Sequence, residues 1–91
     1  MDQRTLQIRQ QLEAVFHPIE LNIVDESWKH AGHAGVKEHG GGHFVVEIVS
    51  NQFVGKSRIE RQRMVNHALK ALFGPVIHAL TIDAKPPATE S

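Results

Sequence analysis

The chain has 91 residues, a formal net charge of zero, seven histidines and no cysteine, and 41% of its residues are hydrophobic. This length fits one domain, the missing cysteines exclude disulfides and metal sites made of the chain's own thiolates, and the balanced charge argues against a surface built for strong generic phosphate binding. No apolar run approaches the roughly 20 residues that cross a bilayer and no secretory leader is visible at the start, so we expect a cytoplasmic protein without a membrane partner.

Residues 3–16 predict an amphipathic helix, because apolar side chains recur at the spacing of one helical face. These side chains are Ile8, Leu12, Val15 and Phe16. His17 followed by Pro18 should end the helix, since the residue before a proline is pushed out of the helical region.

Two strands should follow, at residues 20–26 and 43–50. The first shows the two-residue alternation of side chains that is typical of a strand. The second is rich in β-branched and aromatic residues. We expect them to pair antiparallel, so that the segment between them is a hairpin loop. This loop is unusually long, and with the start of the second strand it holds five of the seven glycines and four histidines. The histidines are His30, His33, His39 and His43.

A second helix is expected to begin after Ser57, because Glu60 stands three residues later and completes a capping box. An apolar stripe follows, and Gly74 with Pro75 should stop the helix after Phe73. The stripe consists of Val65, Ala68, Leu69, Leu72 and Phe73.

Residues 76–84 predict the last strand, which gives the order α-β-β-α-β. The expected fold class is a mixed helix and strand domain (α/β in the broad sense, α+β in the strict sense) with a three-stranded sheet. Three strands cannot close a barrel, so both helices should pack on one face of the sheet. We expect a single domain over residues 1–85 and a disordered, proline-containing tail over residues 86–91.

The start of the second helix is rich in basic side chains, with one acid, Glu60, among them. The basic residues are Lys56, Arg58, Arg61, Arg63 and Lys70. A helix start beside glycine and lysine can bind phosphate, so this surface is a candidate for a nucleic-acid backbone or for a partner's carboxylates. The alternative is the solvated face of an amphipathic helix. The lack of aromatic side chains for stacking argues against single-stranded nucleic acid.

Imidazole binds iron, zinc, copper and nickel, so the histidine-rich loop is a candidate metal site, and His78 on the last strand is a further candidate. A closed structural zinc site usually has four ligands with thiolates among them, and an iron–sulfur site would have to borrow thiolates from another molecule. The alternatives are a solvated hairpin loop and, for His78, a hydrogen-bonded histidine beside apolar neighbours. No nucleophile stands with an evident base, so we do not expect an enzyme.

The chain resembles the BolA family over residues 4–86, nearly its full length. The segments that carry the resemblance are Asp25-Glu26-Ser27 with His30-Ala-Gly-His33, then His43 to Ser50, then Phe53 to Arg58 with Arg61-Gln62-Arg63, and finally Ile77-His78-Ala-Leu80. The family usually has Arg-His-Arg in the helix, where this chain has Gln62 in the middle, and a tyrosine is common where it has Asn66.

This resemblance implies a fold similar to class II KH domains. It also implies an adapter in iron–sulfur homeostasis and stress response, whose partner is a monothiol glutaredoxin. A bridging [2Fe–2S] cluster would take cysteine and glutathione from the glutaredoxin side, so the isolated protein should hold no cofactor. Carried over by position, the loop ligand is His30 and the C-terminal ligand is His78, with His33 and His43 as neighbours that could substitute.

Two other hypotheses stand beside this one. Some members of the family are described as DNA-binding transcriptional regulators, and the basic helix is the candidate surface for duplex DNA. The third hypothesis is autonomous zinc or copper binding by the histidine-rich loop alone.

Overall fold

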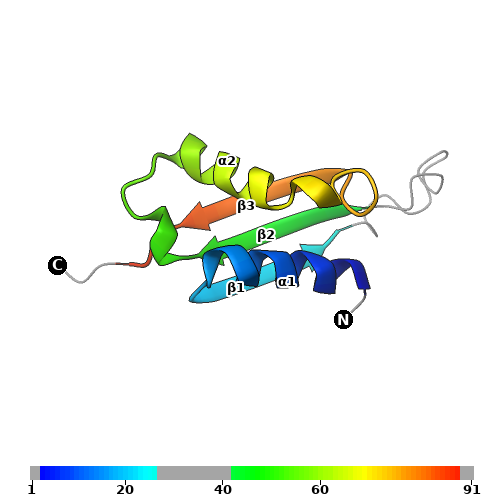
Figure 1. Ribbon diagram of the computed structural model, residues 1–91, viewed down its shortest axis with the longest axis horizontal. Helices are drawn as coiled ribbons and strands as arrows, with labels where there is room; N and C mark the ends of the chain where they lie inside the picture. Colours follow the sequence, from blue (N-terminus) through cyan, green and yellow to red (C-terminus); the bar gives the residue numbers. More distant parts are fainter. Residues whose placement is uncertain (1–2, 27–41, 89–91) are drawn as a thin grey trace.

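The computed structural model of the chain describes residues 3–26 and 42–88, which form two α-helices and a three-stranded sheet (Figure 1). The main elements are α1 (Gln3–Phe16), β1 (Glu20–Asp25), β2 (His43–Val49), α2 (Arg58–Ala68) and β3 (Ala79–Lys85). Two short 3-10 helices, η3 (Asn51–Phe53) and η4 (Lys70–Leu72), flank α2. The predicted α-β-β-α-β order is therefore confirmed.

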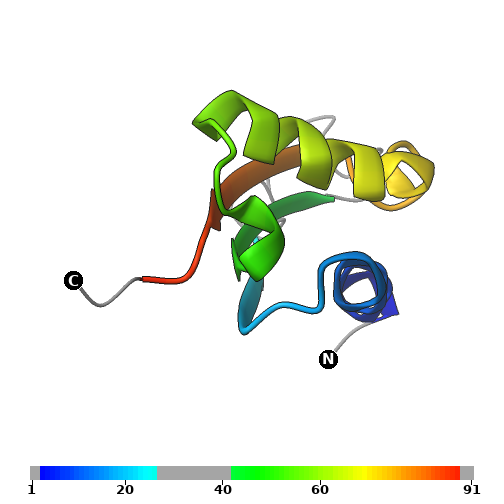
Figure 2. The same ribbon diagram turned by 60° about the vertical axis from the view of Figure 1, so that its left-hand side comes forward.

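The sheet is mixed, with β2 in the centre. β1 pairs antiparallel with β2, as predicted, from Glu20 opposite Val49 to Asp25 opposite Phe44. β3 pairs parallel with β2, because the chain crosses over through α2 before it returns to the sheet. Both helices lie on one face of the sheet, with α1 next to β1 and α2 next to β3 (Figures 1 and 2). None of the described residues forms a layer on the other face, which we call the open face.

The hydrophobic core lies between this sheet and the two helices. The central strand β2 contributes Phe44, Val46 and Ile48, all at most 1% exposed. The helices cover them with fully buried side chains, which are Ile8 and Leu12 of α1, Val65 of α2 and Leu69 directly after α2. Val15, expected on the apolar face of α1, is instead 38% exposed. It lies at the border of the buried face, where it lines a hollow between α1 and α2.

The apolar pattern overestimates the length of both α2 and β3. α2 ends at Ala68, and the 3-10 turn η4 replaces its last turn, so that Phe73 is 37% exposed. The chain then turns at Gly74, which has a φ of 100° and donates its N–H to the carbonyl oxygen of Ile77 at 2.9 Å. Val76 and Ile77 are buried although they precede β3. Their apolar character therefore reflects packing against the core and not membership of β3, although Ile77 forms an isolated bridge with Phe73.

Ser50, expected to end the second strand, is a buried junction just after β2. Its hydroxyl donates to the carbonyl oxygen of Phe16 at 2.8 Å and accepts from the N–H of Gln52 at 3.1 Å. Its own N–H donates to the carbonyl oxygen of Lys85 at 3.1 Å. One small side chain and its backbone thus join the ends of α1, β2 and β3.

The chain leaves the sheet at Lys85, and the following Pro86 and Pro87 are half-buried. The disorder of residues 86–91 and the single domain over residues 1–85 stay predictions. Within residues 3–26 and 42–88, no helix is both long and apolar enough to span a membrane.

Candidate functional site

The end of the sheet at which β2 and β3 begin carries the predicted C-terminal ligand, His78. This residue is exposed and directly precedes β3. The backbone N–H groups of His78 and Ala79 donate to the carbonyl oxygen of Gly42 at 2.8 and 3.1 Å, and the N–H of Glu26 donates to the carbonyl oxygen of His43 at 2.7 Å. Glu26 and Gly42, which flank residues 27–41, therefore both lie at the same end of the sheet as His78.

Gly42 packs directly against His78. It is buried and has a φ of +81°, a conformation that side chains disfavour. A Cβ atom at this position would lie 2.8 Å from Cδ2 of His78 and 2.9 Å from the carbonyl oxygen of Val76. The imidazole of His78 thus packs directly against the backbone of Gly42.

His43 is the second described histidine at this end of the sheet. It is half-buried at the first position of β2, opposite Ala79 of β3. Successive side chains of a strand alternate between faces, and Phe44 points into the core. His43 therefore belongs to the open face.

The predicted ligands His30 and His33 lie outside the described residues, as does His39. Within residues 3–26 and 42–88, no three His, Cys, Asp or Glu side chains are grouped so that they could hold a metal ion. Near the sheet end, the described part offers the imidazoles of His43 and His78. Binding of zinc or copper by the loop alone stays a prediction.

The start of α2 is fixed by the predicted capping box, which is confirmed. The hydroxyl of Ser57 accepts from the N–H of Glu60 at 3.2 Å, and the carboxylate of Glu60 accepts from the N–H of Ser57 at 2.7 Å. The hydrogen bond with the backbone of Ser57 is the largest cause that lowers the pKa of Glu60, and the one with the Ser57 side chain is the next. The chain's own carboxylate thus uses the helix terminus that could otherwise bind a phosphate.

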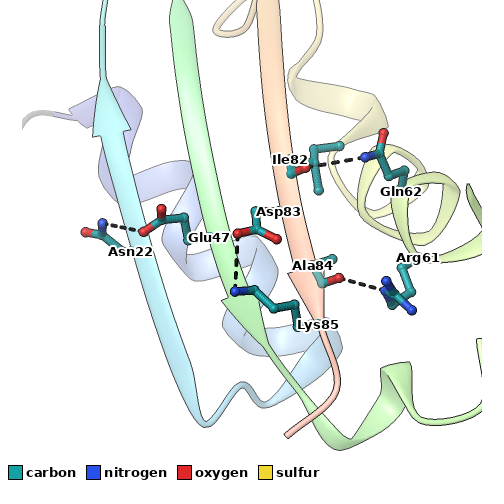
Figure 3. Close-up of polar contacts among 8 residues, drawn as sticks. All are labelled: Asn22, Glu47, Arg61, Gln62, Ile82, Asp83, Ala84 and Lys85. Atoms are coloured by element: carbon teal, nitrogen blue, oxygen red, sulfur yellow. Dashed lines mark hydrogen bonds and ion pairs between the residues drawn. The ribbon is translucent and has the colours of Figure 1, made fainter. Parts of the chain in front are cut away.

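Arg61, predicted as a nucleic-acid or partner contact, is engaged within the fold. Its Nε donates to the carbonyl oxygen of Ala84 in β3 at 2.7 Å (Figure 3), and its Nη1 donates to the carbonyl oxygen of Lys56 at 2.7 Å. The next residue, Gln62, donates to the carbonyl oxygen of Ile82 at 3.4 Å (Figure 3). Arg61 therefore braces α2 against both β3 and the turn that precedes α2.

The other four predicted basic residues are exposed, and we call them the basic surface: Lys56, Arg58, Arg63 and Lys70. Arg58 also lines a hollow of about 250 Å³ between α2 and β3, together with Arg61 and Gln62. Exposed cations of this kind can meet the phosphates of a nucleic acid or the carboxylates of a protein.

A polar row on the open face was not anticipated from the sequence. The carboxylate of Glu47 accepts from the side-chain amide of Asn22 at 3.0 Å, and Asp83 pairs with Lys85 at 3.5 Å (Figure 3). Glu47 and Asp83 stand opposite each other on β2 and β3. The sequence signal for this row is the placement of single acids at outward positions of otherwise apolar strands.

Known proteins share both the sequence pattern and this architecture. The profile of the family described as BolA, BolA-like protein, matches residues 12–89. The chain belongs to the BolA family. The match to the BolA profile includes α2, the basic surface and His78, and the α+β fold with a mixed three-stranded sheet is that of solved BolA domains.

Three similar proteins illustrate the range of BolA relatives. SufE-like protein 1, chloroplastic/mitochondrial, from Arabidopsis thaliana is 42% identical in an alignment of 89 residues that covers 93% of this chain but only 24% of that protein. The solved BolA domain of SufE1 from the same plant has a TM-score of 0.81 at 39% identity, covering 96% of this chain and 95% of that one. The DNA-binding transcriptional regulator BolA from Escherichia coli is 36% identical over 75 residues, covering 82% of this chain and 68% of that protein.

Proposed function

We propose that this BolA-family protein is a non-enzymatic adapter that binds a monothiol glutaredoxin and shares a bridging [2Fe–2S] cluster with it. Its role would lie in iron–sulfur homeostasis and the stress response. The observation that carries the proposal is the position of His78, held by Gly42 at the end of the sheet where residues 27–41 leave and rejoin the described chain.

The chain length between Glu26 and His30 supports His30 as the second ligand. His30 follows Glu26 by four residues, so an extended backbone spans at most about 14 Å between their Cα atoms. The backbone N–H of Glu26 donates to the carbonyl oxygen of His43 at the end of the sheet that also carries His78. His33 and His43 remain the substitutes for His30.

The donor set fits one half of a shared site. The chain has no cysteine, so its own contribution is limited to imidazole and carboxylate groups. Two imidazoles from this chain would complement thiolates from the glutaredoxin and its glutathione. Imidazole ligation of one iron raises the reduction potential of such a cluster above that of all-thiolate ligation, and it requires the neutral form of histidine.

Reconstitution tests this proposal directly. Mixing the protein with a monothiol glutaredoxin, glutathione, iron and sulfide should give a coloured heterodimer, and His78→Ala should change its visible spectrum. His17→Asn is the matched control, because it removes a histidine near the opposite end of the sheet and asparagine tolerates the φ of 47° found there. An unchanged spectrum with His78→Ala would reject His78 as a ligand, and the absence of any heterodimer would reject the adapter role.

A second candidate function is regulation through duplex DNA. The printed name of the Escherichia coli relative, and the exposure of all four residues of the basic surface, support it. Four phosphate contacts predict a log–log salt slope of about −3.6 for duplex binding. A titration at low salt that detects no binding would eliminate this function.

The cytoplasm stays the predicted location. The name of the SufE-like relative places that protein in chloroplasts and mitochondria, and this is said of that relative alone. Fractionation of the native cell with an antibody to this chain would decide between these compartments.

A further inference from the structure

The outer edge of β3 is a free side of the sheet with a defined set of backbone groups that no other strand pairs with among the described residues. β3 lies at one side of the sheet, where the N–H of Ala79 and the carbonyl oxygen of Lys85 both bond toward the β2 side. Backbone groups alternate in direction along a strand, so those of Leu80, Ile82 and Ala84 point away from β2. Such an edge can template pairing with another strand.

Two side chains of α2 cover this edge. Arg61 bonds to the carbonyl oxygen of Ala84 at 2.7 Å, and Gln62 bonds to that of Ile82 at 3.4 Å. Figure 3 shows both side chains reaching from α2 to consecutive outward carbonyls of β3. A side chain also covers the other edge of the sheet, since Arg9 of α1 donates to the carbonyl oxygen of Leu21 in β1 at 3.3 Å.

The charged side chains of β3 are compatible with pairing to a second copy of this chain. An antiparallel pair of β3 strands centred on Ile82 uses the outward groups of Leu80, Ile82 and Ala84 for its hydrogen bonds. In that register Asp83 stands opposite Thr81, and Lys85 stands opposite Ala79, so no like charges face each other. With seven residues, β3 has the usual length of a strand in a sheet, and in the pair each β3 would already belong to a three-stranded sheet.

We propose that Arg61 and Gln62 close the outer edge of β3 to strand addition, and that the strand they exclude is β3 of a second copy. The three residues of the Arg-Gln-Arg segment, 61 to 63, therefore have different roles. Arg61 and Gln62 occupy carbonyls that the strand pair would need, whereas Arg63 is exposed on the helix. We call these two side chains the guard of the β3 edge, and their role is independent of His78 and of the proposed cluster.

The double variant Arg61→Ala/Gln62→Ala tests the guard. It should self-associate as its concentration rises, with the apparent mass in sedimentation doubling toward that of a dimer. The backbone N–H groups of Ile82 and Ala84 should become protected from hydrogen exchange in the associated form, because they enter the new strand pair. Arg63→Ala/Asn66→Ala is the matched control, since it removes one positive charge and one amide from exposed positions of the same helix.

A third substitution separates specific edge pairing from general aggregation. Adding Thr81→Asp to the double variant places a carboxylate opposite Asp83 in the proposed register, so it should restore the wild-type mass. If the double variant does not fold, Arg61→Met/Gln62→Ala serves in its place, because methionine keeps an unbranched apolar stem but cannot donate to the carbonyl oxygen of Ala84. The proposal is overturned if the folded variant keeps the wild-type mass at every concentration, or associates without protection of Ile82 and Ala84.

Discussion

The carbonyl oxygen of Gly42 accepts the backbone N–H of His78 at 2.8 Å, and the imidazole of His78 lies where a side chain on residue 42 would have to be. The last described residue before β2 therefore sets the position of the leading ligand candidate. Any residue other than glycine has to relieve two contacts, because Cδ2 of His78 and the carbonyl oxygen of Val76 would lie 2.8 and 2.9 Å from the added Cβ.

Gly42→Ala is expected to move the His78 imidazole and to destabilise the fold. The positive φ alone costs about 1–2 kcal/mol, and the contact with His78 adds to this cost. Gly55→Ala is the control, because Gly55 has a similar φ of +78° but no atom within 4 Å of an added Cβ. NMR of the His78 ring protons and chemical unfolding measure the two effects. Equal destabilisation in both variants, with unmoved His78 signals, would contradict the predicted contact.

Ser50→Ala should lower the free energy of unfolding by about 1–3 kcal/mol. The variant leaves the buried carbonyl oxygen of Phe16 without the hydroxyl donor now 2.8 Å away, and unpaired buried polar groups carry costs of this size. Urea unfolding monitored by circular dichroism gives the value. Asn51→Ala, at the exposed neighbouring position, should change stability far less. A loss no greater than that of the control would show that the junction contributes little.

The capping box predicts a dependence of stability on pH. The pKa of Glu60 is below its ordinary value of 4.5 in the folded protein, so its contribution is complete above pH 4.5 and is lost as the pH falls through the folded pKa. Glu60→Gln removes the ionisable group but keeps a side-chain acceptor. Thermal unfolding at neutral and acidic pH should show a gap between wild type and variant that narrows in acid. A gap that stays constant with pH would argue against the carboxylate.

If the protein binds duplex DNA, Arg63→Ala and Arg61→Ala should differ in their salt dependence. Loss of one phosphate contact reduces the magnitude of the log–log slope by about 0.9, which we expect for the exposed Arg63. Arg61 is bonded to the carbonyl oxygens of Ala84 and Lys56, so its loss should leave the slope near the wild-type value. Fluorescence anisotropy over a range of salt measures both slopes. An equal fall in both would place Arg61 on the phosphates.

The sequence predicted those features that depend on local chemistry. The capping box of Ser57 and Glu60 and the stop at His17 and Pro18 follow from side-chain and backbone preferences within a few residues, and both are found. The misplaced start of the last strand has a tertiary cause. Val76 and Ile77 are apolar because they fill the core, and apolar character alone cannot distinguish that role from strand pairing.

The candidate site was predictable in its parts but not in its arrangement. His78 was one of several candidate histidines until the family resemblance assigned it as the C-terminal ligand, and its contact with Gly42 depends on a β3 register that no local pattern encodes. Arg61 shows the opposite limit. A basic residue in a charged helix start suggests an external anion, whereas its partners are carbonyl oxygens of the chain, and backbone acceptors leave no signature in a sequence.

The mixed sheet brings together strands that lie at different distances along the chain. β1 and β2 pair across residues 26–42, but β3 reaches β2 only after the chain has passed through α2, so its parallel pairing spans a longer stretch of sequence. His78 takes its place beside Gly42 when that last pairing forms. Joint binding of a cluster by His30 and His78, as we propose it, would therefore require the completed pairing of β2 with β3 and would be lost in any chain in which β3 is unpaired.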